Sequence, residues 1–124
     1  MSLDISLYSP AEAVLCVCEC GHAHTRMAEE TIFSANITHN LGAMAEYVGI
    51  YQCLWRPEDL DITRAGQLIE PLTQGLAKLK AEPVKCRDLD PKNGWGSYGD
   101  LLVFVSSCLA ACTTFPGACV RVSR

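Results

Sequence analysis

Five thiol and imidazole side chains stand at alternate positions near the start of this 124-residue chain: Cys16, Cys18, Cys20, His22 and His24. Thiolates and imidazoles are the donors that proteins most often use to hold zinc. The expected ligands are Cys18, Cys20, His22 and His24, with Cys16 as a spare donor. Four protein ligands would saturate the ion, so the predicted zinc site is structural, with no open position for hydrolysis.

The spacing of these donors constrains the backbone that could hold the ion. On a regular strand, residues two apart are separated by roughly 6.5–7 Å. Ligand atoms around one zinc lie only about 3.5–4 Å apart, given the length of Zn–S bonds. The chain would therefore have to curl, and Gly21 permits such a curl. The alternative is that Cys16 and Cys18 are buried core thiols and that the two histidines are exposed loop residues.

The other cysteines favour packing over chemistry. Cys108 and Cys112 are four residues apart, which would allow chelation on a helix, but they share a stripe with apolar residues. We expect them in the core. The N-terminal residues 1–4 show neither a basic region nor an apolar signal core, so we expect a cytoplasmic protein with reduced thiols. The longest apolar run, residues 101–105, is too short to cross a bilayer, so no membrane partner is expected.

Two polar junctions combine donor side chains with glycine, and each precedes an expected helix. The first contains Asn36, His39 and Asn40, and the second contains Asn93 and Trp95. Such junctions can bind phosphate or carboxylate groups, and an indole can stack on a base. If the fold brings them together, these five residues would line a nucleotide-sized site with His39 as an acid or base. The alternative is that they are helix caps, turn residues and a packed aromatic.

The charge distribution argues against a nucleic-acid partner. The formal net charge is -4, and the basic residues are concentrated between residues 78 and 92. Acidic residues at 82, 88 and 90 interrupt that segment. A nucleic-acid surface usually carries a more continuous positive charge, so we expect a solvated helix end and loop.

The apolar pattern predicts an α+β fold in one domain spanning residues 1–124. Alternation predicts strands at residues 3–8, 13–18, 30–37 and 118–122. We expect the second and third strands to form a hairpin with the Cys/His cluster at its tip. Helical spacing predicts helices over residues 41–55 with Asn40 as the cap, over 63–82 with Thr63 as the cap, and from Ser97 to Phe115. Pro71 should kink or restart the second helix. The expected architecture is thus a small, mostly antiparallel sheet of three N-terminal strands and a C-terminal strand, with about three helices on one face.

Three segments carry a resemblance to other proteins. They are Asn-Ile-Thr-His-Asn-Leu at 36–41, Leu-Trp-Arg-Pro at 54–57 and Asn-Gly-Trp-Gly-Ser-Tyr at 93–98. In these segments the chain resembles a group of small uncharacterised phage and prophage proteins. The resemblance runs from about residue 30 to the C-terminus and implies a phage accessory or host-modulating role, without implying a mechanism.

These observations lead to two principal hypotheses. The first is a non-enzymatic, zinc-stabilised cytoplasmic protein that binds another protein or a small ligand. The second is a nucleotide-like ligand site at the two junctions, in a protein that binds or processes that ligand. A third possibility is a redox or structural protein in which no cysteine binds metal.

Overall fold

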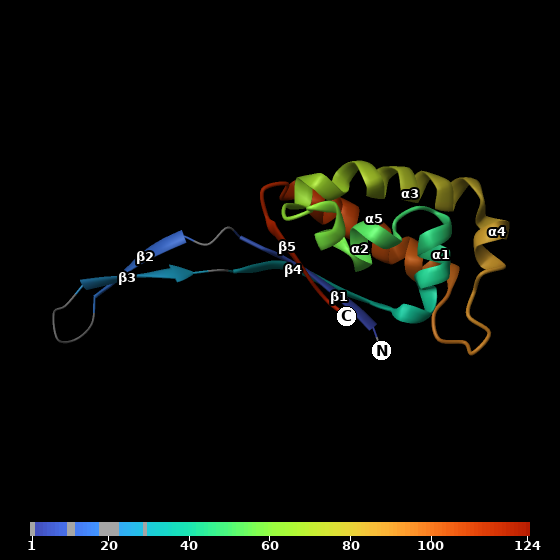
Figure 1. Ribbon diagram of the computed structural model, residues 1–124, viewed down its shortest axis with the longest axis horizontal. Helices are drawn as coiled ribbons and strands as arrows, with labels where there is room; N and C mark the ends of the chain where they lie inside the picture. Colours follow the sequence, from blue (N-terminus) through green and yellow to red (C-terminus); the bar gives the residue numbers. More distant parts are fainter. Residues whose placement is uncertain (1, 10–11, 18–22, 29) are drawn as a thin grey trace.

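The main sheet has three antiparallel strands in the order β4-β1-β5. The computed structural model describes the backbone of residues 2–9, 12–17, 23–28 and 30–124 and the side chains of residues 2–9 and 30–124. The strands are β1 (Ser2–Tyr8), β4 (Thr31–Thr38) and β5 (Cys119–Ser123). All helices lie on one face of this sheet (Figure 1). The predicted α+β class is confirmed.

The side-chain alternation of β1 separates a core face from an outer face. Leu3, Ile5 and Leu7 are buried, whereas Asp4 between them is exposed. The register places Leu3 opposite Ile37 on β4, so alternate residues of both strands face the helices. Hydrophobic alternation therefore predicted both the strand and which of its two faces is buried.

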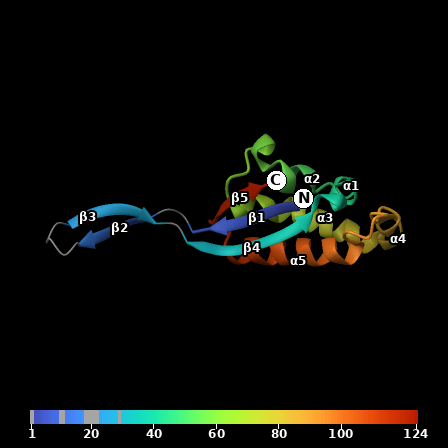
Figure 2. The ribbon, with the colours of Figure 1, turned by 90° about the horizontal axis from the view of Figure 1, so that it is seen from below.

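A second, two-stranded sheet lies beyond the end of the main sheet. It consists of β2 (Glu12–Val17) and β3 (Ala23–Ala28), which pair with each other. Figures 1 and 2 both show it away from the helices. The expected pairing of the second strand with residues 30–37 was wrong, because β2 pairs with β3 and β4 pairs with β1. The sequence of β3, Ala-His-Thr-Arg-Met-Ala, lacks the β-branched alternation that would have marked it as a strand.

The expected helix over residues 41–55 is two short helices. They are α1 (Gly42–Tyr47) and α2 (Tyr51–Trp55), and a 3-10 turn over His39–Leu41 precedes them. Gly49 separates the helices with φ +81°, a conformation that interrupts helical geometry. Asn40 is not the cap, since its N–H donates to the Thr38 hydroxyl at 3.3 Å.

The C-terminal half contains α3 (Ile69–Ala81), α4 (Pro83–Arg87) and α5 (Tyr98–Thr114). Short 3-10 turns cover Pro57–Leu60 and Ala65–Leu68, and the second of these leads directly into α3. Thr63 is therefore not the cap of α3. Pro71 lies in the first turn of α3, where its missing N–H has no intrahelical acceptor to lose. The predicted cap of α5 is confirmed, because the Ser97 hydroxyl accepts from the Asp100 N–H at 3.3 Å.

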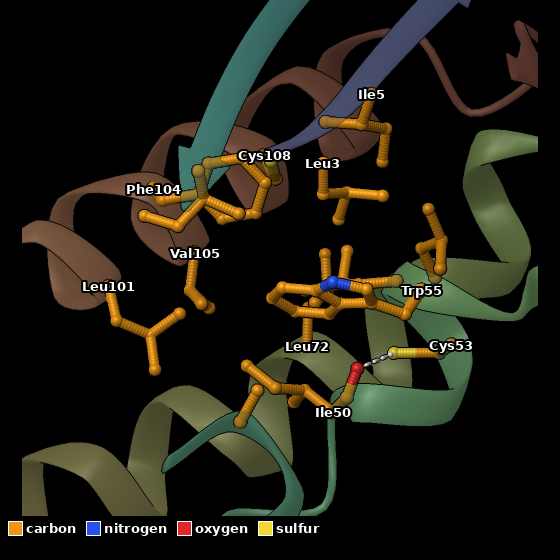
Figure 3. Packing of buried hydrophobic residues seen from close by; sticks show 14 of the residues in the cluster. Leu3, Ile5, Ile50, Cys53, Trp55, Leu72, Leu101, Phe104, Val105 and Cys108 are labelled. Atoms are coloured by element: carbon orange, nitrogen blue, oxygen red, sulfur yellow. Dashed lines mark hydrogen bonds between the residues drawn. The ribbon is translucent and has the colours of Figure 1, made fainter. Parts of the chain in front are cut away.

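The hydrophobic core lies between the sheet and the helices. Figure 3 shows Leu3 and Ile5 of β1 above Trp55, with Phe104 and Val105 of α5 beside them. Each fully buried side chain of this size contributes about 1.5–3 kcal/mol relative to exposure. Cys108 and Cys112 are buried in the same cluster, so their predicted place in the core is confirmed.

Candidate ligand groove

An open groove of about 530 Å³ runs between β4 and α5. Figure 2 shows the two elements side by side, with β4 at the edge of the main sheet. The groove is lined by residues 33–38 of β4, by Trp95 and Gly96, and by Asp100, Val103, Phe104 and Ser107. The four α5 residues have the spacing of one stripe along a helix. One wall is thus a strand and the other is a helical face.

A second hollow of about 500 Å³ continues around the end of β4. It is lined by Ser2, Asn36, Thr38, Asn40 and Trp95. Trp95 borders both hollows, so a ligand in either would contact its indole ring.

The loop before α5 places Trp95 at the groove. The Asn93 side-chain oxygen accepts from the Trp95 N–H at 2.9 Å, and Gly94 and Gly96 adopt φ +77° and +105°. A Cβ on Gly96 would lie 2.7 Å from the Thr38 Cγ2 atom, so only glycine lets the loop approach β4 this closely. The indole is nevertheless left 71% exposed.

Three of the five predicted ligand residues come together at this place. Asn36 and Asn40 from the first junction lie with Trp95 from the second around the end of β4. The Asn36 amide nitrogen donates to Ser2 Oγ at 2.8 Å and to Asp4 Oδ1 at 2.6 Å, which fixes its side chain across the outer face of the sheet. The structure thus brings residues of both polar junctions to one place, which was the condition for the predicted ligand site.

The other two predicted residues have different surroundings. His39 Nδ1 accepts a hydrogen bond from Trp55 Nε1 at 2.9 Å, and its ring is tilted against that indole. Neither hollow includes His39 in its lining. Asn93 is exposed and acts as a turn residue. The structure thus gives Asn93 the turn role that was the alternative reading and places His39 against the core.

The α5 wall of the groove was missed in the sequence. The apolar stripe from Leu101 to Cys112 predicts the buried face of α5. No comparable pattern in the sequence marks the face that lines the groove. The available signal was Val103, an apolar residue off the buried stripe, which proves to be 65% exposed. Beside it, the Asp100 carboxylate makes no ion pair or hydrogen bond with the described residues.

The predicted zinc ligands cannot be placed together from the structure. Cys18, Cys20 and His22 lie outside the described residues, and the structure gives only the backbone of His24. His24 belongs to β3 and is directly opposite Cys16 of β2. Within the described ranges, no group of three or more His, Cys, Asp or Glu side chains could hold a metal ion.

The buried thiols are poor candidates for nucleophiles. Burial raises the pKa of Cys53 to about 12 and that of Cys112 to about 11. The Cys53 thiol also donates to the Ile50 carbonyl at 3.3 Å (Figure 3). A thiol must ionise to react, so these side chains serve packing.

Comparison with known proteins adds no assignment. No family model matches the chain, and neither the curated proteins nor the solved structures include a significant match. Among the described helices, none has both the length and the apolar composition required to cross a membrane.

Proposed function

We propose that this chain is a non-enzymatic binding protein whose ligand occupies the groove between β4 and α5. The observation that carries the proposal is the position of Trp95, a large aromatic ring exposed at the rim of a concave, partly apolar surface. Covering such a ring removes apolar area from water, at about 25 cal/mol per Å². Exposed aromatic residues at concave sites are typical of ligand recognition.

The loop that carries Trp95 supports this interpretation. Two positive-φ glycines and an Asn93 side-chain bond hold the ring over the groove, although the ring adds little to the core. The close approach of this loop to Thr38 is made at Gly96. The indole is therefore better explained by contact with a ligand than by stabilisation of the fold.

The chemistry of the lining favours binding over catalysis. Among the described residues that line the main groove, Asp100 is the one with an ionisable side chain. A hydrolytic or transfer site usually combines a nucleophile or base with a partner that orients it. The described lining supplies no such pair.

A small nucleotide-like ligand is the second candidate. Stacking on Trp95 and hydrogen bonds to the amides of Asn36 and Asn40 favour a planar polar ring. The Asp100 carboxylate would repel a phosphate group in the main groove. A nucleoside or base therefore fits this surface better than a nucleotide does.

Tryptophan fluorescence tests the proposed function directly. The chain has two tryptophans, and Trp55 is only 2% exposed, so a ligand in the groove should blue-shift the emission of Trp95 alone. The probes are a panel of nucleosides and a pool of random octapeptides. Trp95→Phe should abolish the shift, and Trp55→Phe should retain it. Absence of any shift with both panels would contradict the proposed function.

We further propose that zinc stabilises the β2–β3 sheet. A two-stranded hairpin is marginally stable alone in water, and the register brings Cys16 and His24 opposite each other beside residues 18–22. The proposed ligands remain Cys18, Cys20, His22 and His24. Plasma mass spectrometry of protein purified under reducing conditions should find about one zinc per chain. A Cys18→Ser/Cys20→Ser variant should lose it, and substoichiometric zinc in the unmodified protein would contradict the site.

The proposed biological setting rests on the sequence resemblance alone. Similarity to small phage and prophage proteins favours an accessory or host-modulating role in the cytoplasm. A groove that binds a host component is compatible with that role. Identifying the ligand would test whether the protein acts on the host.

A further inference from the structure

The hydrogen bonds of β5 show which residues of β4 direct their backbone N–H and C=O groups toward β1 and which direct them away from it. The Val120 N–H of β5 donates to the Thr63 carbonyl at 2.9 Å, so Val120 directs its backbone groups away from β1. Val120 is opposite Leu7, which must therefore direct its own backbone groups toward β4. Leu7 is opposite Phe33, and backbone direction alternates along a strand. Ser34 and Asn36 consequently present N–H and C=O groups away from β1, toward the groove.

These backbone groups lie at an unpaired edge. In the described part of the chain, no hydrogen bond is recorded at the outward-directed backbone groups of Ser34 and Asn36. Ser34 and Asn36 both line the groove, and their spacing matches the repeat of a strand. An unpaired edge of this kind is a template for another extended chain.

The opposite wall provides contacts for the side chains of such a chain. Val103 is 65% exposed and gives the groove its apolar surface on α5, the mostly buried Phe104 lies beside it, and Ser107 and Asp100 flank them along the helix. An extended peptide between a strand edge and a helix gains main-chain hydrogen bonds on one side and side-chain contacts on the other.

We propose that the groove binds an extended segment of another protein, which adds to β4 as a fourth strand of the main sheet and directs a lysine or arginine toward Asp100. This proposal rests on the proposed function and names the class of ligand for the same groove. The resulting order is segment-β4-β1-β5. Main-chain pairing with Ser34 and Asn36 supplies affinity, and the cation supplies selectivity.

The charge of the groove distinguishes a foreign segment from a second copy of this chain. Asp100 is the charged side chain of the described lining, which contains neither Lys nor Arg. Strand β4, Thr-Ile-Phe-Ser-Ala-Asn-Ile-Thr, has no charged residue, so β4 of a second copy would bring no cation to Asp100. A basic segment of a different protein complements the groove, and β4–β4 pairing does not.

The experiment is a selection of random octapeptides displayed on phage against the immobilised protein, followed by amide hydrogen exchange on the selected peptides' complexes. We expect enriched peptides to carry a lysine or arginine at a fixed position. Binding should slow exchange at Ser34 and Asn36, and Ala35, which already faces β1, should change little. Asp100→Asn should weaken binding by up to about fivefold, since exposed ion pairs contribute ~0.2–1 kcal/mol. Asp88→Asn, at an exposed position outside the groove, is the matched control.

Each other outcome overturns a defined part of the proposal. Peptides that bind and shift Trp95 emission without slowing exchange at Ser34 and Asn36 would refute strand addition, while the groove would remain the binding site. Selection of peptides without a cation, or equal binding to Asp100→Asn, would refute the role of Asp100. A Trp95 response to nucleosides alone, or concentration-dependent dimers that protect Ser34 and Asn36, would replace the foreign peptide with a small ligand or a second copy. No Trp95 response to any probe would refute the proposed function as well.

Discussion

The two edge strands of the main sheet, β5 and β4, differ in how their outer backbone groups are hydrogen-bonded. At the β5 edge, the segment before α3 runs alongside the strand, and the Val120 and Ala65 N–H groups donate to Thr63 and Ala118 at 2.9 and 2.8 Å. Arg64 forms an isolated bridge with Cys119 there. At the β4 edge, the neighbouring element is α5, whose backbone groups are already used within the helix. The β4 edge therefore lies next to α5 and yet pairs with no other strand among the residues that the structure describes.

This difference indicates where the molecule is available to a partner. Open strand edges promote aggregation, and proteins usually cover or disrupt them. Here the register shift between Leu7 and Tyr8 and the wall formed by α5 limit access to β4. A single extended segment can enter such a groove more readily than the flat edge of another sheet.

Proline substitution at the two edges should give the largest contrast. Val120→Pro removes the N–H that donates to Thr63, and the ring would collide with the neighbouring segment. We expect a loss of about 2–4 kcal/mol in the free energy of unfolding, from the lost hydrogen bond and the strained strand. Ser34→Pro removes an N–H that faces the groove, so it should destabilise by less than half as much.

Urea denaturation measures both variants, and Val120→Ala and Ser34→Ala serve as controls for the loss of each side chain. Equal destabilisation by the two prolines, after this correction, would show that the β4 edge is paired in solution.

One methyl group at Gly96 would disturb the packing of the 93–98 loop against β4. Gly96→Ala combines an unfavourable φ of +105° with a Cβ 2.7 Å from Thr38, whereas Gly94→Ala has an unfavourable φ of +77° and no atom within 4 Å. We expect Gly96→Ala to destabilise by about 1–3 kcal/mol and Gly94→Ala by about 1 kcal/mol. The difference isolates the close approach of the loop to β4.

Denaturation curves and Trp95 emission should be recorded together for this pair. If Gly94→Ala disturbed the fold as much as Gly96→Ala, the contact with Thr38 would not be what positions the loop.

The smallest effect concerns an ion pair beside the covered edge. The Arg124 guanidinium donates to Glu58 Oε1 and to the Trp55 carbonyl, each at 2.6 Å. A backbone hydrogen bond, together with Arg124, holds the pKa of Glu58 below its ordinary value. A carboxyl with a lowered folded-state pKa stabilises the fold above its unfolded pKa, and this contribution is lost as the pH falls through the folded value.

Glu58→Gln should therefore reduce the dependence of stability on pH in the acidic range and have little effect near pH 7 beyond the lost ion pair. Urea midpoints from pH 3 to 7 test this, with Asp59→Asn, an exposed neighbour, as the control. Identical pH profiles for Glu58→Gln and the unmodified protein would contradict the assignment.

Local sequence patterns determined much of the fold. Alternation identified β1 and its buried face, and Ser97 identified the start of α5, because a strand repeat and a helix cap depend on residues close in sequence. The same reasoning failed for β3 and for Asn40. β3 is a strand because it pairs with β2. Thr38 replaces Asn40 as the cap because its hydroxyl accepts from the Asn40 N–H.

The sequence by itself determined that Asn36, Asn40 and Trp95 stand at polar junctions before helices. Only the tertiary structure decided that those junctions meet, because residues 36–40 and 93–98 are brought together by packing of the 93–98 loop, at Gly96, on Thr38 and Leu41. It likewise decided that β4 is an unpaired edge and that His39 contacts Trp55. Whether a strand lies at the edge or the centre of a sheet depends on the strand order. That order is set by contacts between residues far apart in the chain, so the sequence of one strand does not reveal it.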